Sequence, residues 1–258
     1  MWVDSCTVDL GGVRAGIRAN SQAAASGLRQ LLGRHVVDDP DAPRNFSVQF
    51  SRDPHRAHLL YWGGCVAARS FDPDRLVRAV LRHLSAHLHP PEGLVLVRAL
   101  PFVHDGVAVL MPETFRDDLR IEDRRLRGMG YVSVDSPRAL VDLARAELVV
   151  DEPLDTDDRA LPLVVSGAAR RRIEPTVEPG RYPIERWVFL SQLAQWGDLS
   201  RATATRVGVL DVVDGITRLD EGVIRTMAAL FTKVRATSMF PTYPGAVVDA
   251  LVGRGRAT

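Results

Sequence analysis

The sequence predicts an α/β protein of the mixed α+β kind, with a small N-terminal unit followed by a larger sheet flanked by helices. Runs rich in β-branched and aromatic residues, bounded by Gly, Pro and Asp, indicate strands, and apolar residues at helical spacing indicate helices between them. Two prolines and a glycine in 89–93 (HPPEG) end a helix and separate the two parts. We therefore expect an N-terminal α+β domain over 1–90 and an α/β domain over 91–258.

The N-terminal part contains two clear signals for helix boundaries. Ser21 and Gly33 are suited to the two ends of one helix, because a serine side chain can accept a free N–H and a glycine readily adopts the left-handed conformation that closes a helix. Asp72 and Pro73 begin a second helix, which extends to about Leu88, since proline is favoured at the first helical position. The other elements expected here are a short hairpin or a bulged strand over 7–18, a loop over 36–44, and strands over 46–51, 58–62 and 65–70.

The second part contains the order of elements that is most informative about function. It predicts, in order, a strand over 94–100, a turn at 104–106, a strand over 107–111, a helix over about 118–127 and a strand over 131–134. We expect these to be followed by a helix over 136–144, a strand over 147–151, an acidic loop over 152–160, a strand over 161–165, an exposed segment over 168–183, a strand over 186–191, and helices over 200–213, 220–235 and 244–252.

A strand, a loop and a helix N-terminus in this order form the frame in which P-loop proteins hold phosphate, because free N–H groups and the helix dipole attract anions. The P-loop itself has the pattern G-x-x-x-x-G-K-[ST], whose glycines let the backbone approach the phosphates and whose lysine reaches them. Residues 111–118 (MPETFRDD) contain no glycine, no lysine and three carboxylates, and the only lysine of the chain is Lys233. The sequence therefore argues that the chain does not use conventional P-loop catalysis.

Charge and cysteine content narrow the class of protein. A formal net charge of +1 gives no indication of binding to nucleic acid or to a membrane surface. Cys6 and Cys65 lack the spacing of metal ligands, so we expect no disulfide framework, and a reducing cytoplasm suits the chain. There is neither a signal-peptide pattern nor an apolar run of the ~20 residues that a membrane span needs. We therefore expect a cytoplasmic protein.

Two later stretches carry a family resemblance. Residues 126–135 (LRGMGYVSVD) contain a helix end, a glycine, an aromatic residue and a Ser-Asp pair, and residues 239–244 (MFPTYP) precede a short helix over 246–251 (AVVDAL). With the order of strands, they resemble the HPr kinase-like family, specifically its smaller actinobacterial and peptide-cluster relatives, which carry an additional N-terminal domain. The resemblance implies a P-loop-kinase-like sheet in 91–258 from which the P-loop is missing, and Arg98 lies near the position of a histidine common in relatives.

The resemblance implies two functions from different classes. The first is a catalytically degenerate member, without cofactor, that acts as a binding or accessory protein for a peptide or a partner enzyme in a biosynthetic or regulatory cluster. The alternative is a phosphotransferase, a serine kinase using ATP and Mg²⁺, in which Arg116 or Arg120 replaces the lysine, Thr114 also contacts the nucleotide and Asp135 is the general base. Because the family often forms oligomers, a homo-oligomer is a further expectation.

Three histidines at the end of the second helix offer a possible metal site. His83 and His87 are spaced by four residues and share a helical face, and His89 follows them, so that they could bind one metal ion with Glu92. A surface helix end, where the dipole favours cations, accounts for the same residues, and we expect no metal.

Two further clusters have a structural and a functional interpretation. Glu113, Asp117, Asp118 and Asp135 could gather at the C-terminal edge of the sheet and hold a cation, or the two adjacent aspartates could cap a helix. Ser133, Asp135 and His104 would need the geometry of a hydrolase, but the sequence has no G-x-S-x-G motif. Trp196, in a polar context, is a candidate for an exposed protein contact.

Overall fold

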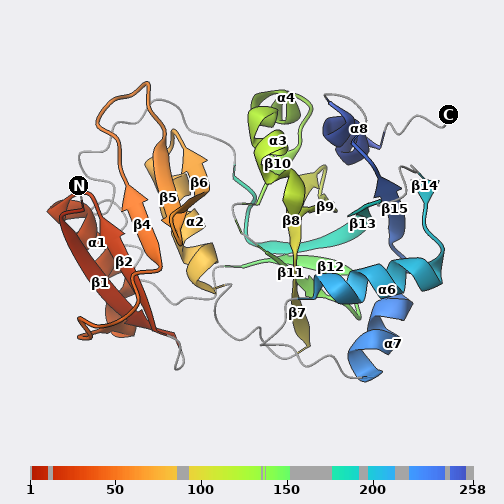
Figure 1. The fold of residues 1–258 in the computed structure, drawn as a ribbon, viewed down its shortest axis with the longest axis horizontal. Coiled ribbons are helices and arrows are strands. Elements are labelled where there is room, and N and C mark those ends of the chain that lie inside the picture. Colours follow the sequence, from red (N-terminus) through yellow and green to blue (C-terminus); the bar gives the residue numbers. More distant parts are fainter. Residues whose placement is uncertain are drawn as a thin grey trace. The chain divides into compact units, whose positions relative to one another are not determined.

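The computed structural model describes residues 2–10, 14–85, 93–134, 136, 138–151, 176–191, 197–212, 221–241 and 245–253. The chain forms two compact units, and the described residues up to 85 belong to the first and those from 93 onward to the second (Figure 1). The predicted mixed α+β class is confirmed, because each unit contains a mixed sheet flanked by helices. The predicted domain boundary at residue 90 lies outside the described residues and stays a prediction.

The first unit is a six-stranded sheet in the order β3-β1-β2-β4-β5-β6, in which only β2 and β4 run parallel. Ser21 caps α1, since its Oγ accepts a hydrogen bond from the Ala24 N–H at 3.2 Å, and Gly33, with φ of +30°, ends the helix as predicted. The elements are β1 (Asp4–Asp9), β2 (Arg14–Ala19), α1 (Gln22–Leu32), η1 (Gly33–His35), β3 (Val36–Val37), β4 (Phe46–Gln49), β5 (His58–Trp62), β6 (Cys65–Ser70) and α2 (Pro73–Ser85).

Both helices of the first unit pack on one face of its sheet. Leu28 of α1 and Leu76 of α2 belong to one buried cluster with inward side chains of the strands, such as Phe46. The opposite face is more polar, because the Arg18 Nε donates to the Ser47 Oγ at 3.0 Å there. The unit is therefore a two-layer structure with one apolar and one partly exposed sheet face.

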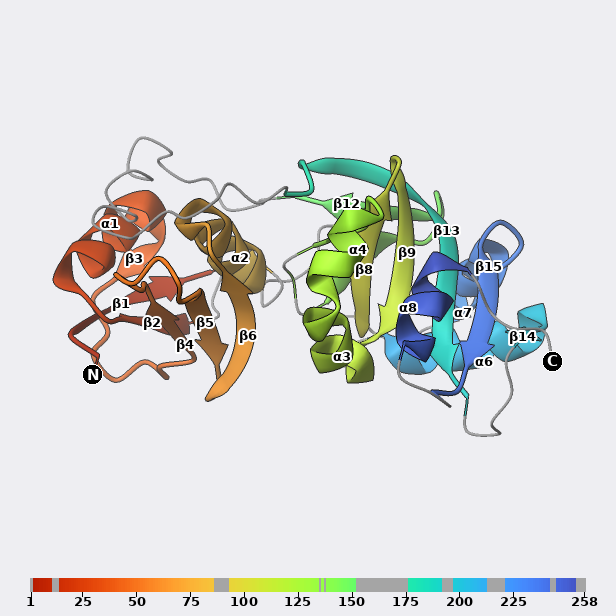
Figure 2. The ribbon, with the colours of Figure 1, turned by 90° about the horizontal axis from the view of Figure 1, so that it is seen from above.

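The second unit is built on a nine-stranded sheet in which β13 joins two parts (Figure 2). The beginning of β13 pairs antiparallel with β12, and its later residues pair parallel with β9 on one side and β15 on the other. We call β7, β11 and β12 the antiparallel arm, and β8, β9, β10, β13, β14 and β15 the central sheet. The strands are β7 (Leu94–Val97), β8 (Ala99–His104), β9 (Val107–Pro112), β10 (Val132–Ser133), β11 (Ala139–Asp142), β12 (Glu147–Val150), β13 (Gly180–Leu190), β14 (Gly197–Asp198) and β15 (Arg235–Met239).

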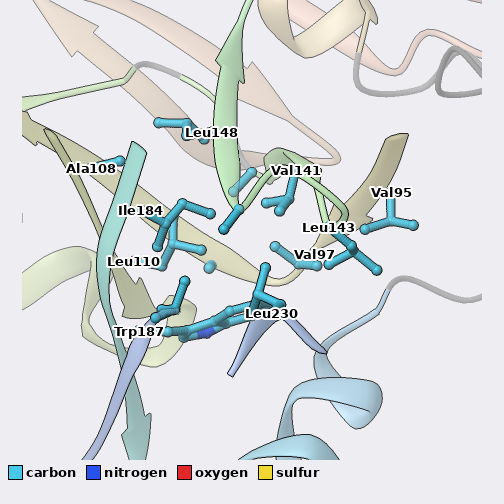
Figure 3. Close-up of a cluster of buried hydrophobic side chains, with 14 of the residues drawn as sticks. Val95, Val97, Ala108, Leu110, Val141, Leu143, Leu148, Ile184, Trp187 and Leu230 are labelled. Atoms are coloured by element: carbon cyan, nitrogen blue, oxygen red, sulfur yellow. The ribbon is translucent and has the colours of Figure 1, made fainter. Parts of the chain in front are cut away.

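Helices cover both faces of the central sheet. On one face, Trp187 and Leu230 belong to a cluster that also includes strands of the antiparallel arm (Figure 3). On the other, Met111 and Val188 pack against Phe115 and α8 residues such as Leu251. The first face carries α6 (Arg201–Asp211) and α7 (Glu221–Leu230), and the second η2 (Glu113–Phe115), α3 (Arg116–Ile121), α4 (Asp123–Gly128) and α8 (Ala246–Val252).

Several predicted elements of the second part are wrong in extent or type. The predicted helix over 136–144 is the strand β11, because Ala139 and Val141 are buried through pairing with β7 and β12, and this pairing overrides local helix propensity. The expected strand over 94–100 is two strands that separate at Arg98, and the helix expected over 118–127 is interrupted at Glu122. The helix expected over 220–235 ends at Leu230, and Arg235 is the first residue of β15. β13 includes the end of the segment 168–183 that we expected to be exposed, and the expected loop 152–160 and strand 161–165 lie outside the described residues.

None of the helices in the described part of the chain has the length and the apolar run that a transmembrane crossing requires.

Candidate functional site

The junction between β9 and α3 occupies the place at which the sequence predicts a missing P-loop. The chain leaves β9 at Pro112, makes the short helix η2 and enters α3, whose N-cap position is Phe115, without a side-chain cap. The Phe115 side chain is 6% exposed and packs with Met111 and Leu119. The backbone of this junction is therefore backed by a buried aromatic ring and contains no glycine, unlike a phosphate-wrapping loop.

The three residues expected to contact a nucleotide lie at this junction. The Arg116 Nη2 is 3.2 Å from the Glu113 Oε1, and the Arg120 Nη1 is 3.3 Å from the Asp117 Oδ1, so both guanidinium groups contact acids of their own segment. Thr114 is exposed. Asp135, the predicted general base, lies outside the described residues, and its role stays a prediction.

The predicted capping role of the adjacent aspartates is wrong. Asp117 and Asp118 lie in the first turn of α3 and are exposed, and Phe115 occupies the N-cap position. An acid in the first turn still interacts favourably with the helix dipole, so these residues have a structural role without capping. Within the described ranges no group of three or more His, Cys, Asp or Glu side chains could hold a metal ion.

The remaining candidates of the sequence are placed only in part. His83 is buried in the first unit, with its ring centre 6.4 Å from that of Phe46, so the surface position expected for this histidine is wrong. His104 stacks on Tyr131 at 4.3 Å between ring centres, whereas Ser133 pairs with Phe102 in the neighbouring strand. His87, His89, Glu92 and Trp196 lie outside the described residues.

A second set of charged residues meets where β7 ends and β8 begins. Arg98 separates the two strands, and three pairings fix its neighbours. Ala99 pairs with Pro112, Val97 pairs with Ala139, and Val97 forms a bridge with Val212. Glu113, Arg138 and Asp211 are the chain neighbours of these paired residues, and Arg98 is close enough to Arg138 and Asp211 to act on both electrostatically.

A backbone contact supports this placement, because the Arg98 N–H donates to the Asp211 carbonyl oxygen at 2.7 Å. We call Arg98, Glu113, Arg138 and Asp211 the Arg98 junction. It connects the antiparallel arm, the central sheet and the end of α6, and it shares Glu113 with the β9–α3 junction.

Burial perturbs the ionisation of two residues of the Arg98 junction, Asp211 and Arg138. The pKa of Asp211 is raised to about 6, mainly by burial. The positive charge of Arg98 opposes this rise, and the negative charge of Glu113 adds to it. Burial also lowers the pKa of Arg138, which the charge of Glu113 opposes and the charge of Arg98 reinforces. Arg138 and Asp211 thus have the same two charged neighbours, Arg98 and Glu113. Perturbed groups near common charges are typical of functional sites, although structural ion pairs produce them as well.

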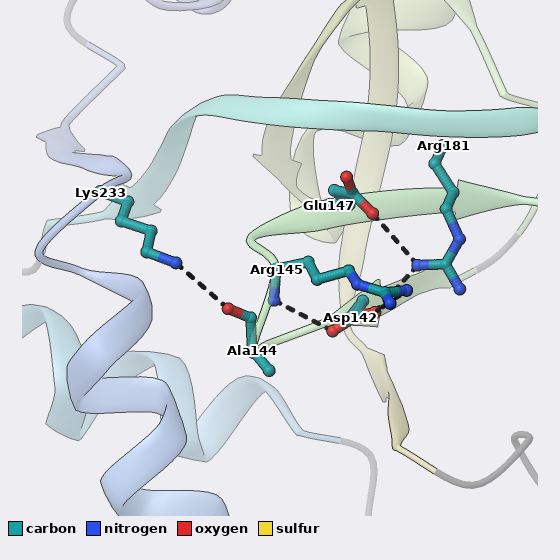
Figure 4. Close-up of polar contacts among 6 residues, drawn as sticks. All are labelled: Asp142, Ala144, Arg145, Glu147, Arg181 and Lys233. Atoms are coloured by element: carbon teal, nitrogen blue, oxygen red, sulfur yellow. Dashed lines mark hydrogen bonds and ion pairs between the residues drawn. The ribbon is translucent and has the colours of Figure 1, made fainter.

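Where the antiparallel arm meets β13, a second charged cluster provides a contrast, because its charged side chains contact one another directly (Figure 4). The Arg181 Nη1 contacts the Asp142 Oδ2 at 2.8 Å and the Glu147 Oε2 at 3.1 Å, and the Asp142 Oδ1 accepts the Arg145 N–H at 3.1 Å. Burial acts to raise the pKa of Asp142, but the Arg145 N–H and Arg181 outweigh it and lower the pKa. These charges are satisfied by one another, and Lys233 donates to the Ala144 carbonyl oxygen nearby at 3.2 Å.

Comparison with known proteins adds no assignment: no model of a protein family matches this sequence, and no curated protein matches it. Sequence reasoning missed Arg138 and Asp211 as site residues, and noted Arg98 only for its position. No motif marks them, because their proximity depends on the register of three separate pairings. The polar break at Arg98 within an apolar run is the one signal that could have pointed to the Arg98 junction.

Proposed function

We propose that this protein is a catalytically degenerate relative of the HPr kinase fold, and that it binds a peptide or a partner enzyme as an accessory protein in a biosynthetic or regulatory cluster. The observation that carries the proposal is the β9–α3 junction, where Phe115 is buried and no glycine or lysine is present. A loop of this kind cannot wrap a triphosphate, because a P-loop needs glycines where the backbone approaches the phosphates.

The arginines of the β9–α3 junction support the same proposal. Arg116 and Arg120 each contact a carboxylate of the same segment, so a nucleotide would have to displace Glu113 and Asp117 before it could be bound. The exposed aspartates of α3 add negative charge at the place where a triphosphate would lie. We place the protein in the cytoplasm, because Cys6 and Cys65 are both free thiols. A homo-oligomer is part of the proposal only by resemblance.

A phosphotransferase with an unconventional phosphate site is the second candidate. It is favoured by one observation, the presence of Arg98 and Arg138 beside Glu113, which puts additional cations next to the β9–α3 junction. In this case Arg116 or Arg120 would replace the lysine, and Asp135 would serve as the general base.

Calorimetric titration with ATP and Mg²⁺ distinguishes the two candidates. We expect no heat of binding from the β9–α3 junction at millimolar nucleotide, because Arg116 and Arg120, which would receive the phosphates there, each contact a carboxylate of their own segment. The matched variants are Arg116→Ala with Arg120→Ala, and a control, Arg206→Ala, whose arginine is exposed on α6. Binding by the wild type and the control that is lost in the double variant would contradict the accessory role and favour a kinase with a remodelled phosphate site.

A further inference from the structure

Three of the four side chains of the Arg98 junction, all except Glu113, lack partners for their charges. In the described part of the chain, no hydrogen bond or ion pair is formed by the guanidinium groups of Arg98 and Arg138 or by the carboxyl group of Asp211. Arg138 and Asp211 are half-buried, and both show the effect of lost hydration. Charged groups that are removed from water without a partner destabilise the fold, so their retention at one place calls for a reason.

The position of these residues supplies a reason. Arg98 is exposed and stands between β7, which pairs with β11 of the antiparallel arm, and β8, which pairs with β9 of the central sheet. Both Arg98 and Glu113 are close enough to Arg138 to act on it electrostatically. Glu113 already contacts Arg116 at 3.2 Å, so its charge is largely compensated. The guanidinium groups that remain available are those of Arg98 and Arg138, and guanidinium is the side-chain group best suited to bind oxyanions in a planar, two-pronged manner.

We propose that the Arg98 junction is a binding site for an oxyanion group of the partner, a carboxylate or a phosphoryl group, held by Arg98 and Arg138. The inference rests on the proposed binding role, for which it names the recognised chemistry. Asp211 is the regulating group of the site. When it is ionised it competes with the ligand for Arg98, and when it is protonated it becomes a hydrogen-bond donor to the ligand. The charged groups that act on its carboxyl are Arg98 and Glu113.

Sulfate is the appropriate probe, because its charge stays constant across the range in which Asp211 titrates. The measurement is an NMR titration of the arginine Nε–Hε signals of the whole protein with sulfate, at constant ionic strength, at about pH 5 and about pH 8. We expect saturable shifts of the Arg98 and Arg138 signals, with an affinity roughly tenfold higher at the lower pH, since one neighbouring negative charge is removed.

Substitutions test each part of the site. Arg98→Gln and Arg138→Gln are expected to weaken sulfate binding by roughly tenfold or more each. Asp211→Asn is expected to bind sulfate with an affinity that no longer depends on pH. Arg206→Gln, on the same helix as Asp211 and exposed, is the matched control and should leave the affinity unchanged. Should Arg138→Gln fail to fold, the exposed Arg98 still provides the test.

Several outcomes would overturn the oxyanion site. They are unshifted Arg98 and Arg138 signals at about pH 5, an equal loss of binding in Arg206→Gln, and a pH-dependence that persists in Asp211→Asn.

If sulfate binds, competition with sulfate identifies the ligand class, since displacement by O-phosphoserine supports a phosphoryl group and displacement by glutarate supports a carboxylate. Failure of the proposed function looks different, because heat from ATP and Mg²⁺ would then be lost in Arg116→Ala with Arg120→Ala, whereas ATP held at the Arg98 junction would be lost in Arg98→Gln.

Discussion

The arginines of α3 and α4 and the arginines of the Arg98 junction differ in the kind of partner that each has. On α3 and α4, Arg120 and Arg127 contact acids three or four residues away in sequence, at 3.3 and 2.7 Å. Arg98 and Arg138 interact with acids only electrostatically, across strands that are distant in sequence. Local pairs of this kind form in any helix with that spacing, whereas the charges at the Arg98 junction are brought together by the tertiary fold alone. The second arrangement is therefore the better indicator of a binding site.

The largest effect is expected from the apolar side of the β9–α3 junction. Phe115→Ala would remove a buried ring that packs with Met111 and Leu119, and large-to-small changes of this type lower the free energy of unfolding by about 3 to 5 kcal/mol. Urea denaturation would measure the loss, with Thr114→Ala, at an exposed position, as a nearly neutral control. A loss below about 1 kcal/mol would show that the ring does not fill the junction and would reopen it as a nucleotide site.

An intermediate effect is expected from Asp211, whose pKa in the folded protein is about 6 against an ordinary value of 3.8. Because the folded state holds this proton more tightly, the stabilisation is complete below about pH 4 and is lost as the pH rises through about 6. Asp211→Asn should therefore be more stable than the wild type near pH 7, by roughly 1 to 2 kcal/mol after allowance for solvent at this half-buried group. Urea denaturation at several pH values would test this, and parallel pH profiles of the two proteins would contradict the raised pKa.

The smallest effect is expected from the local pairs. Asp117→Ala removes the contact with Arg120 and one favourable charge at the start of α3, and exposed pairs of this type contribute about 0.2 to 0.5 kcal/mol. The same denaturation experiment in low and high salt would measure it, and the difference should shrink in high salt. A loss above about 1 kcal/mol would mean that the helix pairs are as important as the buried residues, which would remove the contrast with the Arg98 junction.

The sequence predicted the features that depend on residues close together in the chain, and missed those that depend on residues far apart. The cap at Ser21 and the turn at Asp105 and Gly106, both with positive φ, depend on residues a few positions apart, and the sequence predicted them. The interruption of the helix at Glu122 has no local breaker such as Gly or Pro, and the sequence did not predict it. For the Arg98 junction the sequence holds one signal, the polar break at Arg98, and does not identify the neighbours, because Arg138 and Asp211 approach Arg98 only through pairing registers that tertiary packing selects.

The strand β13 has a consequence for how the chain matures during synthesis. β9 and β12 both pair with it, although they precede it in sequence, and β15 joins its remaining edge about 50 residues later. On the ribosome, β9 and β12 each have an unpaired edge until residues 180–190 have left the exit tunnel, and exposed strand edges are sites of aggregation. A nascent chain stalled before β13 should therefore depend on chaperones, whereas one stalled after β15 should already resist proteolysis.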